Sequence, residues 1–120
     1  MKTLQVRRGE IRLARLDPVL GSETGKTRPV LVIQNDIGNR HSPTTIVAVV
    51  TEYSEKKASY PFCVAVKKEE GLDKDSIVNL SQIQTIDKKR LSSPVLAKLS
   101  SDLMRKVDQA IGNSLALDIR

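Results

Sequence analysis

The segment Thr44–Thr51, which reads Thr-Thr-Ile-Val-Ala-Val-Val-Thr, consists almost entirely of β-branched residues. Such side chains are stiff at χ1 and favour strands over helices. Because apolar and polar residues do not alternate in this run, it predicts a strand that is buried on both faces. We predict further strands at Val6–Leu16, Val30–Ile33, Tyr60–Lys67, Ser76–Leu80, Gln82–Ile86 and Val95–Leu99.

Near the C-terminus the hydrophobic pattern changes its period. Apolar residues recur with the spacing of one helix face at Leu103, Val107, Ala110, Ile111 and Leu115. Ser100 or Ser101 is expected to cap this helix, and Asp102 suits its first turn. Short strands followed by one amphipathic helix predict a mainly β fold with α, in which a small, strongly bent sheet or barrel packs against the helix. At 120 residues we expect a single domain, 1–120.

Two polar segments, Asp17–Thr27 and Asn35–Pro43, are rich in turn-forming residues and are predicted to be loops. Arg28 and Pro29 stand between them. A residue that precedes proline is driven out of the helical region. Arg28 is therefore expected to be extended at the entrance of the strand Val30–Ile33.

The chain carries 20 Lys and Arg residues against 14 Asp and Glu residues, for a formal net charge of +6. The excess is concentrated early in the chain, at Arg7, Arg8, Arg12, Arg15, Lys26, Arg28 and Arg40. A basic surface favours a polyanionic partner such as nucleic acid, although ordinary solvation of a basic protein explains the same count. No apolar run approaches the roughly 20 residues of a membrane helix, and Met1–Arg8 lacks the apolar stretch of a signal peptide. We expect a cytoplasmic protein that does not associate with membranes.

Cys63 is the only cysteine and His41 the only histidine. One cysteine forms no internal disulfide and no cysteine zinc site. Its place in a strand-like run favours a small buried hydrophobe. One histidine excludes the ribonuclease chemistry that uses two imidazoles, as well as most histidine metal sites. We therefore expect no metal and no cofactor, and any catalysis must use other groups.

Several short motifs occur in a fixed order along the chain. They are Arg8-Gly9-Glu10, Leu16-Asp17-Pro18, Gly21-Ser22-Glu23, Arg28-Pro29-Val30-Leu31-Val32-Ile33, Gln34-Asn35-Asp36-Ile37-Gly38-Asn39-Arg40, Tyr60-Pro61-Phe62, Asp75-Ser76-Ile77-Val78 and Gln82-Ile83-Gln84-Thr85-Ile86-Asp87. Together they resemble the MazF/PemK toxins of type II toxin–antitoxin systems, and the segment from Gln34 resembles the Gram-positive MazF branch. The resemblance covers nearly the whole chain.

The resemblance implies an SH3-like barrel of the MazF/Kid/CcdB type and a homodimer. It implies a sequence-specific endoribonuclease that cuts single-stranded RNA, including mRNA, without a metal, and so inhibits translation and growth. The products would be 2′,3′-cyclic phosphate and 5′-hydroxyl ends. A small acidic antitoxin resembling MazE is the expected protein partner, because nothing in the chain looks like an internal inhibitor.

The same resemblance assigns catalysis to Arg28 and Thr51. RNA brings its own nucleophile, the 2′-hydroxyl beside the scissile phosphate. An arginine offers a planar fork of donors for phosphate oxygens, and Thr51 would hold a phosphate oxygen or orient the attacking hydroxyl. Charge stabilisation is the first role expected of Arg28, and proton donation the second. The base remains solvent or an unidentified group. The competing interpretations are a surface Arg28 paired with Glu23 or Asp36, and a Thr51 that is an ordinary strand residue.

RNA contacts are expected mainly along the two loops. Their glycine and serine residues allow close approach to phosphate, their basic residues attract it, amide side chains can read base edges, and His41 can stack on a base. The candidate RNA-binding residues are Gly21, Ser22, Glu23, Lys26, Gln34, Asn35, Asn39, Arg40, His41 and Gln84. Turn formation is the competing interpretation of each loop residue.

Two other functions remain open on sequence grounds. A toxin that resembles CcdB would use the same barrel to inhibit gyrase by binding it, and would need neither Arg28 nor Thr51. A non-catalytic barrel would bind RNA and leave it whole.

Overall fold

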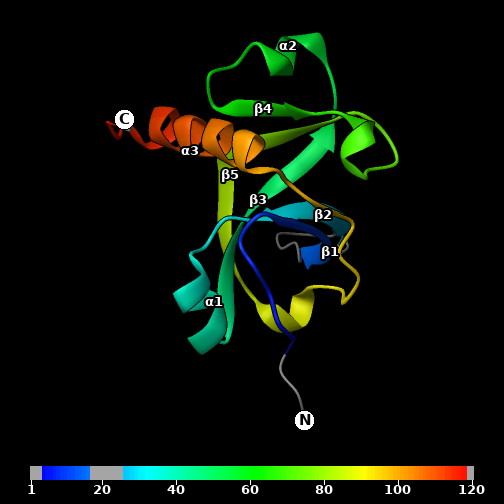
Figure 1. Cartoon of the computed structure of the whole chain (residues 1–120), viewed down its shortest axis with the longest axis vertical. Helices are drawn as coiled ribbons and strands as arrows, with labels where there is room; N and C mark the ends of the chain where they lie inside the picture. The colour runs from blue at the N-terminus through cyan, green and yellow to red at the C-terminus, as the bar shows by residue number, and fades with distance from the viewer. Residues whose placement is uncertain (1–3, 17–25, 119–120) are drawn as a thin grey trace, which may run out of the picture.

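The computed structural model describes residues 4–16 and 26–118. One antiparallel sheet, with the strand order β4-β5-β3-β2-β1-β6, curls into a half-barrel (Figure 1). Its elements are β1 (Glu10–Leu16), β2 (Lys26–Val32), α1 (Asp36–His41), β3 (Thr44–Glu52), α2 (Glu55–Ala58), β4 (Cys63–Val66), η1 (Lys68–Glu70), β5 (Ser76–Asp87), η2 (Lys88–Arg90), β6 (Ala97–Lys98) and α3 (Ser101–Leu115). The prediction of a small, mainly β fold with a C-terminal helix is confirmed. Within the described ranges, no helix is long and apolar enough to cross a membrane.

The strand β3 lies inside the sheet, hydrogen-bonded to β2 on one side and β5 on the other. It contributes to two hydrophobic cores because its side chains alternate between the two faces of the sheet. Ala48 and Val50 belong to the core that includes α3, whereas Val47 belongs to a second core with Val6. All these side chains are buried, so the predicted burial of Thr44–Thr51 on both faces is confirmed for its centre.

The prediction of separate strands at Ser76–Leu80 and Gln82–Ile86 is wrong, because both segments belong to β5. The pairing of β5 with β3 shifts its register between Ala48 and Val49. A bulge of this kind bends a strand and increases its twist. The single strand β5 can therefore serve both halves of the curled sheet, as its long course in Figure 1 shows.

The C-terminal helix α3 lies across one face of the sheet (Figure 1) and matches its prediction. Ser100 is the N-cap, and its hydroxyl accepts a hydrogen bond from the backbone N–H of Leu103 at 3.2 Å. Val107 and Ala110 are buried in the core beneath the helix. Leu115, predicted on the same apolar face, is exposed at the end of the helix.

The prediction that the whole of Asn35–Pro43 is a loop is wrong, because Asp36–His41 forms α1. The Asn35 side chain caps this helix by accepting a hydrogen bond from the Gly38 N–H at 2.7 Å. Asparagine and aspartate, which indicate turns, also suit the cap and the first turn of a helix. The short helix α2, after β3, was not predicted.

The first strand is shorter than the predicted Val6–Leu16 and begins at Glu10. Gly9 has a φ of 96°, a left-handed conformation that interrupts an extended strand and favours glycine. Its N–H donates to the Val32 carbonyl at 2.9 Å. This hydrogen bond ties the N-terminal segment to β2.

Candidate active site

The pairing of β2 with β3 determines where Arg28 and Thr51 lie. Val30 pairs with Val49 and Val32 with Val47. The pairing ends at Val30 and Val49, and Arg28 and Thr51 each lie two residues beyond that pair, on β2 and on β3. Side chains two residues apart on a strand project from the same face of the sheet, so Arg28 and Thr51 lie on the face of Val30 and Val49. Two residues distant in sequence are thus placed on one face at the same end of neighbouring strands.

Thr51 has a basic neighbour that the sequence pattern did not single out. The ammonium group of Lys57, on α2, donates a hydrogen bond to the Thr51 hydroxyl oxygen at 3.4 Å. Both residues are half-buried, as is Arg28. The motif beginning at Ser54 could have predicted a capped turn, but no local signal could show that this turn approaches Thr51.

The described charges around Arg28, Thr51 and Lys57 leave the two cations available to an anion. No described carboxylate lies within ion-pair distance of Arg28 or Lys57. Glu52, the residue after Thr51, instead pairs with Lys74 at 2.6 Å. The hydrogen bond from Lys74 lowers the pKa of this carboxyl, and the charge of Lys57 lowers it further. A hydroxyl bonded to one cation, with a second cation on the neighbouring strand, forms an arrangement suited to a phosphate group.

Cys63 offers no ready protein nucleophile near this cluster. Burial raises the pKa of its thiol, and the charge of Lys57 only partly opposes this effect. The thiol is therefore protonated at neutral pH, whereas the thiolate is the reactive form. His41 lies at the end of α1, just before β3 begins, while Thr51 lies near the other end of β3. At about 3.3 Å per residue, the span from Thr44 to Thr51 is roughly 20 Å.

The predicted RNA-contacting residues fall into separate groups. Gly21, Ser22 and Glu23 lie outside the described residues. Lys26 is exposed at the start of β2, close in sequence to Arg28. The residues from Gln34 to His41 lie on or beside α1, at the opposite end of β2 and β3. Gln84 is exposed on β5, where it pairs with Val47.

The amide groups near α1 are largely engaged within the protein. Asn39 is 2% exposed. Its side-chain oxygen accepts hydrogen bonds from the Gln34 amide and the Thr45 hydroxyl. Its side-chain nitrogen donates to the backbone carbonyl of Gln34 and to the Asp36 carboxylate. The Gln34 amide also donates to the Thr44 carbonyl. Asn39 therefore holds α1 against the sheet and has no group left for a base edge, whereas Arg40 and His41 are exposed.

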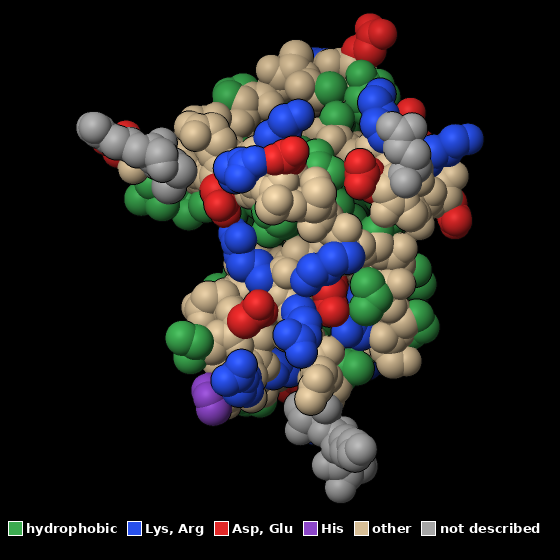
Figure 2. Space-filling model, viewed as in Figure 1, with side chains coloured by type: hydrophobic (Ala, Val, Ile, Leu, Met, Phe, Trp, Pro, Cys, Tyr) green, Lys and Arg blue, Asp and Glu red, His purple; other side chains and the backbone are tan. Residues whose placement is uncertain are grey.

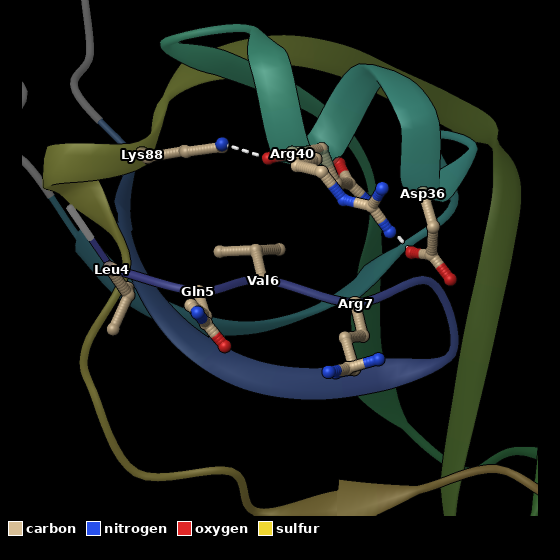
Figure 3. Close-up of a pocket in the computed structure, with 8 residues that line it drawn as sticks. Leu4, Gln5, Val6, Arg7, Asp36, Arg40 and Lys88 are labelled. Atoms are coloured by element: carbon tan, nitrogen blue, oxygen red, sulfur yellow. Dashed lines mark hydrogen bonds between the residues drawn. The ribbon is translucent and has the colours of Figure 1, made fainter.

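A cavity of about 240 Å³ lies between α1, η2 and the N-terminal segment. Figure 3 shows Lys88 reaching from η2 to the end of α1, where its ammonium donates to the backbone carbonyl oxygen of Asn39. Asp36 accepts from the Arg8 N–H, and this hydrogen bond lowers the pKa of the carboxyl. Asp36 therefore does not form the ion pair with Arg28 that was the competing interpretation. Lys88 is bonded within the fold, which distinguishes this cavity from the Arg28–Thr51 region.

The surface charge does not by itself locate a site. Lys and Arg side chains are interspersed with Asp and Glu side chains over the face shown in Figure 2. Among the described residues, no group of three or more His, Cys, Asp or Glu side chains is arranged to hold a metal ion. The arrangement of Arg28, Thr51 and Lys57 is thus more specific than the net charge as an indication of function.

Comparisons with known proteins identify the family of the chain. The family described as "PemK-like, MazF-like toxin of type II toxin-antitoxin system" matches residues 7–115. Endoribonuclease EndoA of Bacillus subtilis is 51% identical over 113 residues, which are 93% of this chain and 96% of that protein.

Solved structures share the fold. The Mycobacterium tuberculosis toxin MazF-mt6 superposes with a TM-score of 0.76 at 27% identity, covering 92% of this chain and 99% of that one. A MazE-MazF structure from Deinococcus radiodurans gives a TM-score of 0.76 at 22% identity, covering 95% of this chain and 98% of that one.

Proposed function

The chain belongs to the PemK-like, MazF-like toxin family of type II toxin–antitoxin systems, and from this premise we propose that it is an endoribonuclease that cuts single-stranded RNA at specific sequences. The pairing of β2 with β3, which leaves Arg28 and Thr51 on one face at the same end of neighbouring strands, is the observation that carries the proposal. The high identity to an endoribonuclease over nearly the whole chain supports it. A gyrase-binding toxin is not favoured, because that activity has no need of this pair.

The proposed reaction uses the RNA's own hydroxyl. The 2′-oxygen attacks the adjacent phosphorus, and the bond from phosphorus to the 5′-oxygen of the next nucleotide breaks. One proton leaves the 2′-hydroxyl and one is taken up by the departing 5′-oxygen. The products are a 2′,3′-cyclic phosphate and a 5′-hydroxyl end.

Each residue has a role in this reaction. A guanidinium stays protonated at neutral pH, so Arg28 acts first by stabilising the negative charge that builds up on the phosphate oxygens. Donors placed in advance at such a charge contribute about 3–4 kcal/mol each. Thr51 holds a phosphate oxygen with its hydroxyl. The positive charge supplied by these side chains leads us to propose that cleavage needs no metal.

Three experiments on long RNA separate the possible functions. Cutting that persists in EDTA and yields 5′-hydroxyl ends is expected. RNA that is bound but left whole would indicate a non-catalytic barrel, and no interaction with RNA would favour a protein-directed toxin. A single 2′-deoxyribose at the cleavage position should block cutting while sparing binding, because it removes the nucleophile. An obligatory requirement for magnesium after chelation and add-back would contradict the mechanism.

RNA contacts are proposed for a narrower set of residues than the sequence suggested. Asn39 is withdrawn, since all its hydrogen-bonding groups are occupied within the fold. In Gln34 the side-chain nitrogen is already hydrogen-bonded within the protein, and in Asn35 the side-chain oxygen is, so each keeps only its other amide atom for RNA. The proposed contacts from the described residues are Lys26, Arg40, His41 and Gln84, and family resemblance adds Gly21, Ser22 and Glu23.

We also propose a cytoplasmic homodimer that is inhibited by an acidic antitoxin. The cytoplasm holds the proposed mRNA substrate, and solved relatives include MazE-MazF structures. An acidic flexible segment can occupy a basic groove in competition with RNA. Light scattering at micromolar concentration should give the dimer mass. The neighbouring gene's product should be displaced by RNA and should bind more weakly in salt; equal binding to RNA-saturated protein would contradict groove occlusion.

A further inference from the structure

The ammonium of Lys57 lies 3.4 Å from the Thr51 hydroxyl oxygen, and the backbone that carries it is held in place. The hydroxyl of Ser54 accepts a hydrogen bond from the Lys57 N–H at 3.1 Å and caps α2. The Ala58 N–H donates to the Ser54 carbonyl at 2.9 Å. Lys57 therefore extends from a closed helical turn rather than from an unconstrained loop.

Lys57 is also spared the usual partner of a lysine. Its acidic neighbour Glu52 is bonded to Lys74. Within residues 4–16 and 26–118, the hydrogen bond to Thr51 is the one interaction found for the Lys57 ammonium at bonding distance. A half-buried cation with a hydroxyl partner and no carboxylate is suited to a site that receives negative charge.

The direction of this hydrogen bond has a chemical consequence. An ammonium group is only a donor, so the Thr51 oxygen must accept. The hydrogen of the Thr51 hydroxyl then points elsewhere and remains available to donate. Arg28 lies on the neighbouring strand β2, two residues beyond the Val30–Val49 pair as Thr51 is on β3, so a phosphate held by Arg28 could take that hydrogen bond. Contacts of this length in a free enzyme often tighten when substrate binds.

We propose that Lys57 is a positioning residue, which orients the Thr51 hydroxyl as a donor to the scissile phosphate. This inference rests on the proposed ribonuclease function. It predicts that Lys57 acts through Thr51 and mainly affects the chemical step. Binding of RNA, which spreads over a longer surface, should depend on it much less.

The test compares Lys57→Met with Lys56→Met in the full-length protein. Both changes remove one charge from α2, but Lys56 is exposed and makes no bond to Thr51. Initial rates on a short RNA with one cleavage site give kcat and KM separately. We expect Lys57→Met to lower kcat by about 10- to 100-fold, the range for loss of one hydrogen bond from a charged group, with KM changed less than about threefold. Lys56→Met should keep kcat within about twofold of wild type.

Coupling to Thr51 is measured with Thr51→Ala and the double variant Thr51→Ala/Lys57→Met. If Lys57 acts through Thr51, the second change should cost little once the first is present. Lys57→Arg retains a donor and should recover part of kcat. Losses that multiply in the double variant, equal loss from Lys56→Met, or wild-type kcat in Lys57→Met would each overturn the inference.

The result also separates this inference from the proposed function. If Arg28→Ala and Thr51→Ala lower kcat strongly but measurably and Lys57→Met does not, the inference about Lys57 alone fails. If Arg28→Ala and Thr51→Ala retain full activity, the active site itself has been misassigned. Circular dichroism and thermal melts show whether each variant is folded. Lys57→Gln keeps a donor but loses the charge, so its kcat separates the effect of orientation from that of charge.

Discussion

The two ends of β3 use their cations in opposite ways. Beside the end near Thr44, Lys88 is 4% exposed and donates to the Asn39 carbonyl. At the end near Thr51, Arg28 and Lys57 are half-buried, and no described carboxylate pairs with either. The first region stabilises α1 against the sheet. The second offers positive charge to a partner that the fold itself does not supply.

This difference shows that burial and bonding partner, rather than residue type, separate structural cations from functional ones. A buried cation must be bonded, because an unpaired charge away from water is very costly. A half-buried cation can keep enough water to remain charged and exchange that water for a phosphate. The same distinction applies to Arg12, which is 3% exposed and bonded to Glu10 and to backbone carbonyls. Substitutions in the two regions should therefore change different measurements.

Arg12→Met should produce the largest loss of stability. It leaves the Glu10 carboxylate, 8% exposed, without its cation at 2.9 Å. Breaking a buried pair in this way costs about 3–5 kcal/mol. Urea unfolding followed by circular dichroism measures the loss, and adding Glu10→Gln should restore part of it. A change below about 1 kcal/mol would show that Arg12 is not a structural cation of this kind.

Arg28→Ala should produce the converse result. We expect kcat/KM on RNA to fall about 100- to 1000-fold, because a donor to the transition-state charge is lost. The free energy of unfolding should change by no more than about 0.5 kcal/mol, as for an ordinary surface change. Arg28→Lys should also be poor, since lysine lacks the planar fork. Cleavage at the wild-type rate in a folded Arg28→Ala protein would refute its catalytic assignment.

Lys88→Met tests the other end of β3. The Asn39 carbonyl at the end of α1 would lose its donor, at a cost of about 1–3 kcal/mol. Cleavage per folded molecule should be unchanged, because Lys88 lies at the end of β5 that pairs with the start of β3. Lys89→Met, an exposed neighbour, is the matched control. A fall in kcat without a loss of stability would remove the distinction between the two ends.

The smallest expected effect concerns the pH dependence at Asp36. The hydrogen bond from the Arg8 N–H lowers the pKa of this carboxyl in the folded state. A carboxyl whose pKa is lower in the folded state stabilises the fold at pH values above its unfolded-state pKa of about 3.9. This stabilisation is lost as the pH falls through the folded-state pKa. Asp36→Asn should therefore be slightly less stable than wild type at pH 7, and the difference should shrink below about pH 4. A difference that is constant from pH 7 to pH 3 would show that the charge of Asp36 is not involved.

Local sequence patterns predicted the long strand and the C-terminal helix, but not the β-bulge or the short helix α1. The β-branched run from Thr44 and the helix period near the C-terminus each depend on neighbouring residues, so both predictions are confirmed. The bulge in β5 was missed because it arises from the pairing of β5 with β3, which no single segment encodes. The short helix α1 was missed because its capping residues are also turn formers.

The sequence alone determined the periodic elements, the excess of positive charge and, through ordered motifs, the resemblance that singles out Arg28 and Thr51. Only the tertiary structure decided that these two residues lie at the same end of neighbouring strands, that Lys57 bonds to Thr51, and that Asn39 and Lys88 serve the fold. The physical reason is that helix and strand periods are local properties of a chain. Register, burial and hydrogen-bond partners instead depend on segments far apart in sequence, so the availability of a side chain for chemistry is known only after those segments have packed.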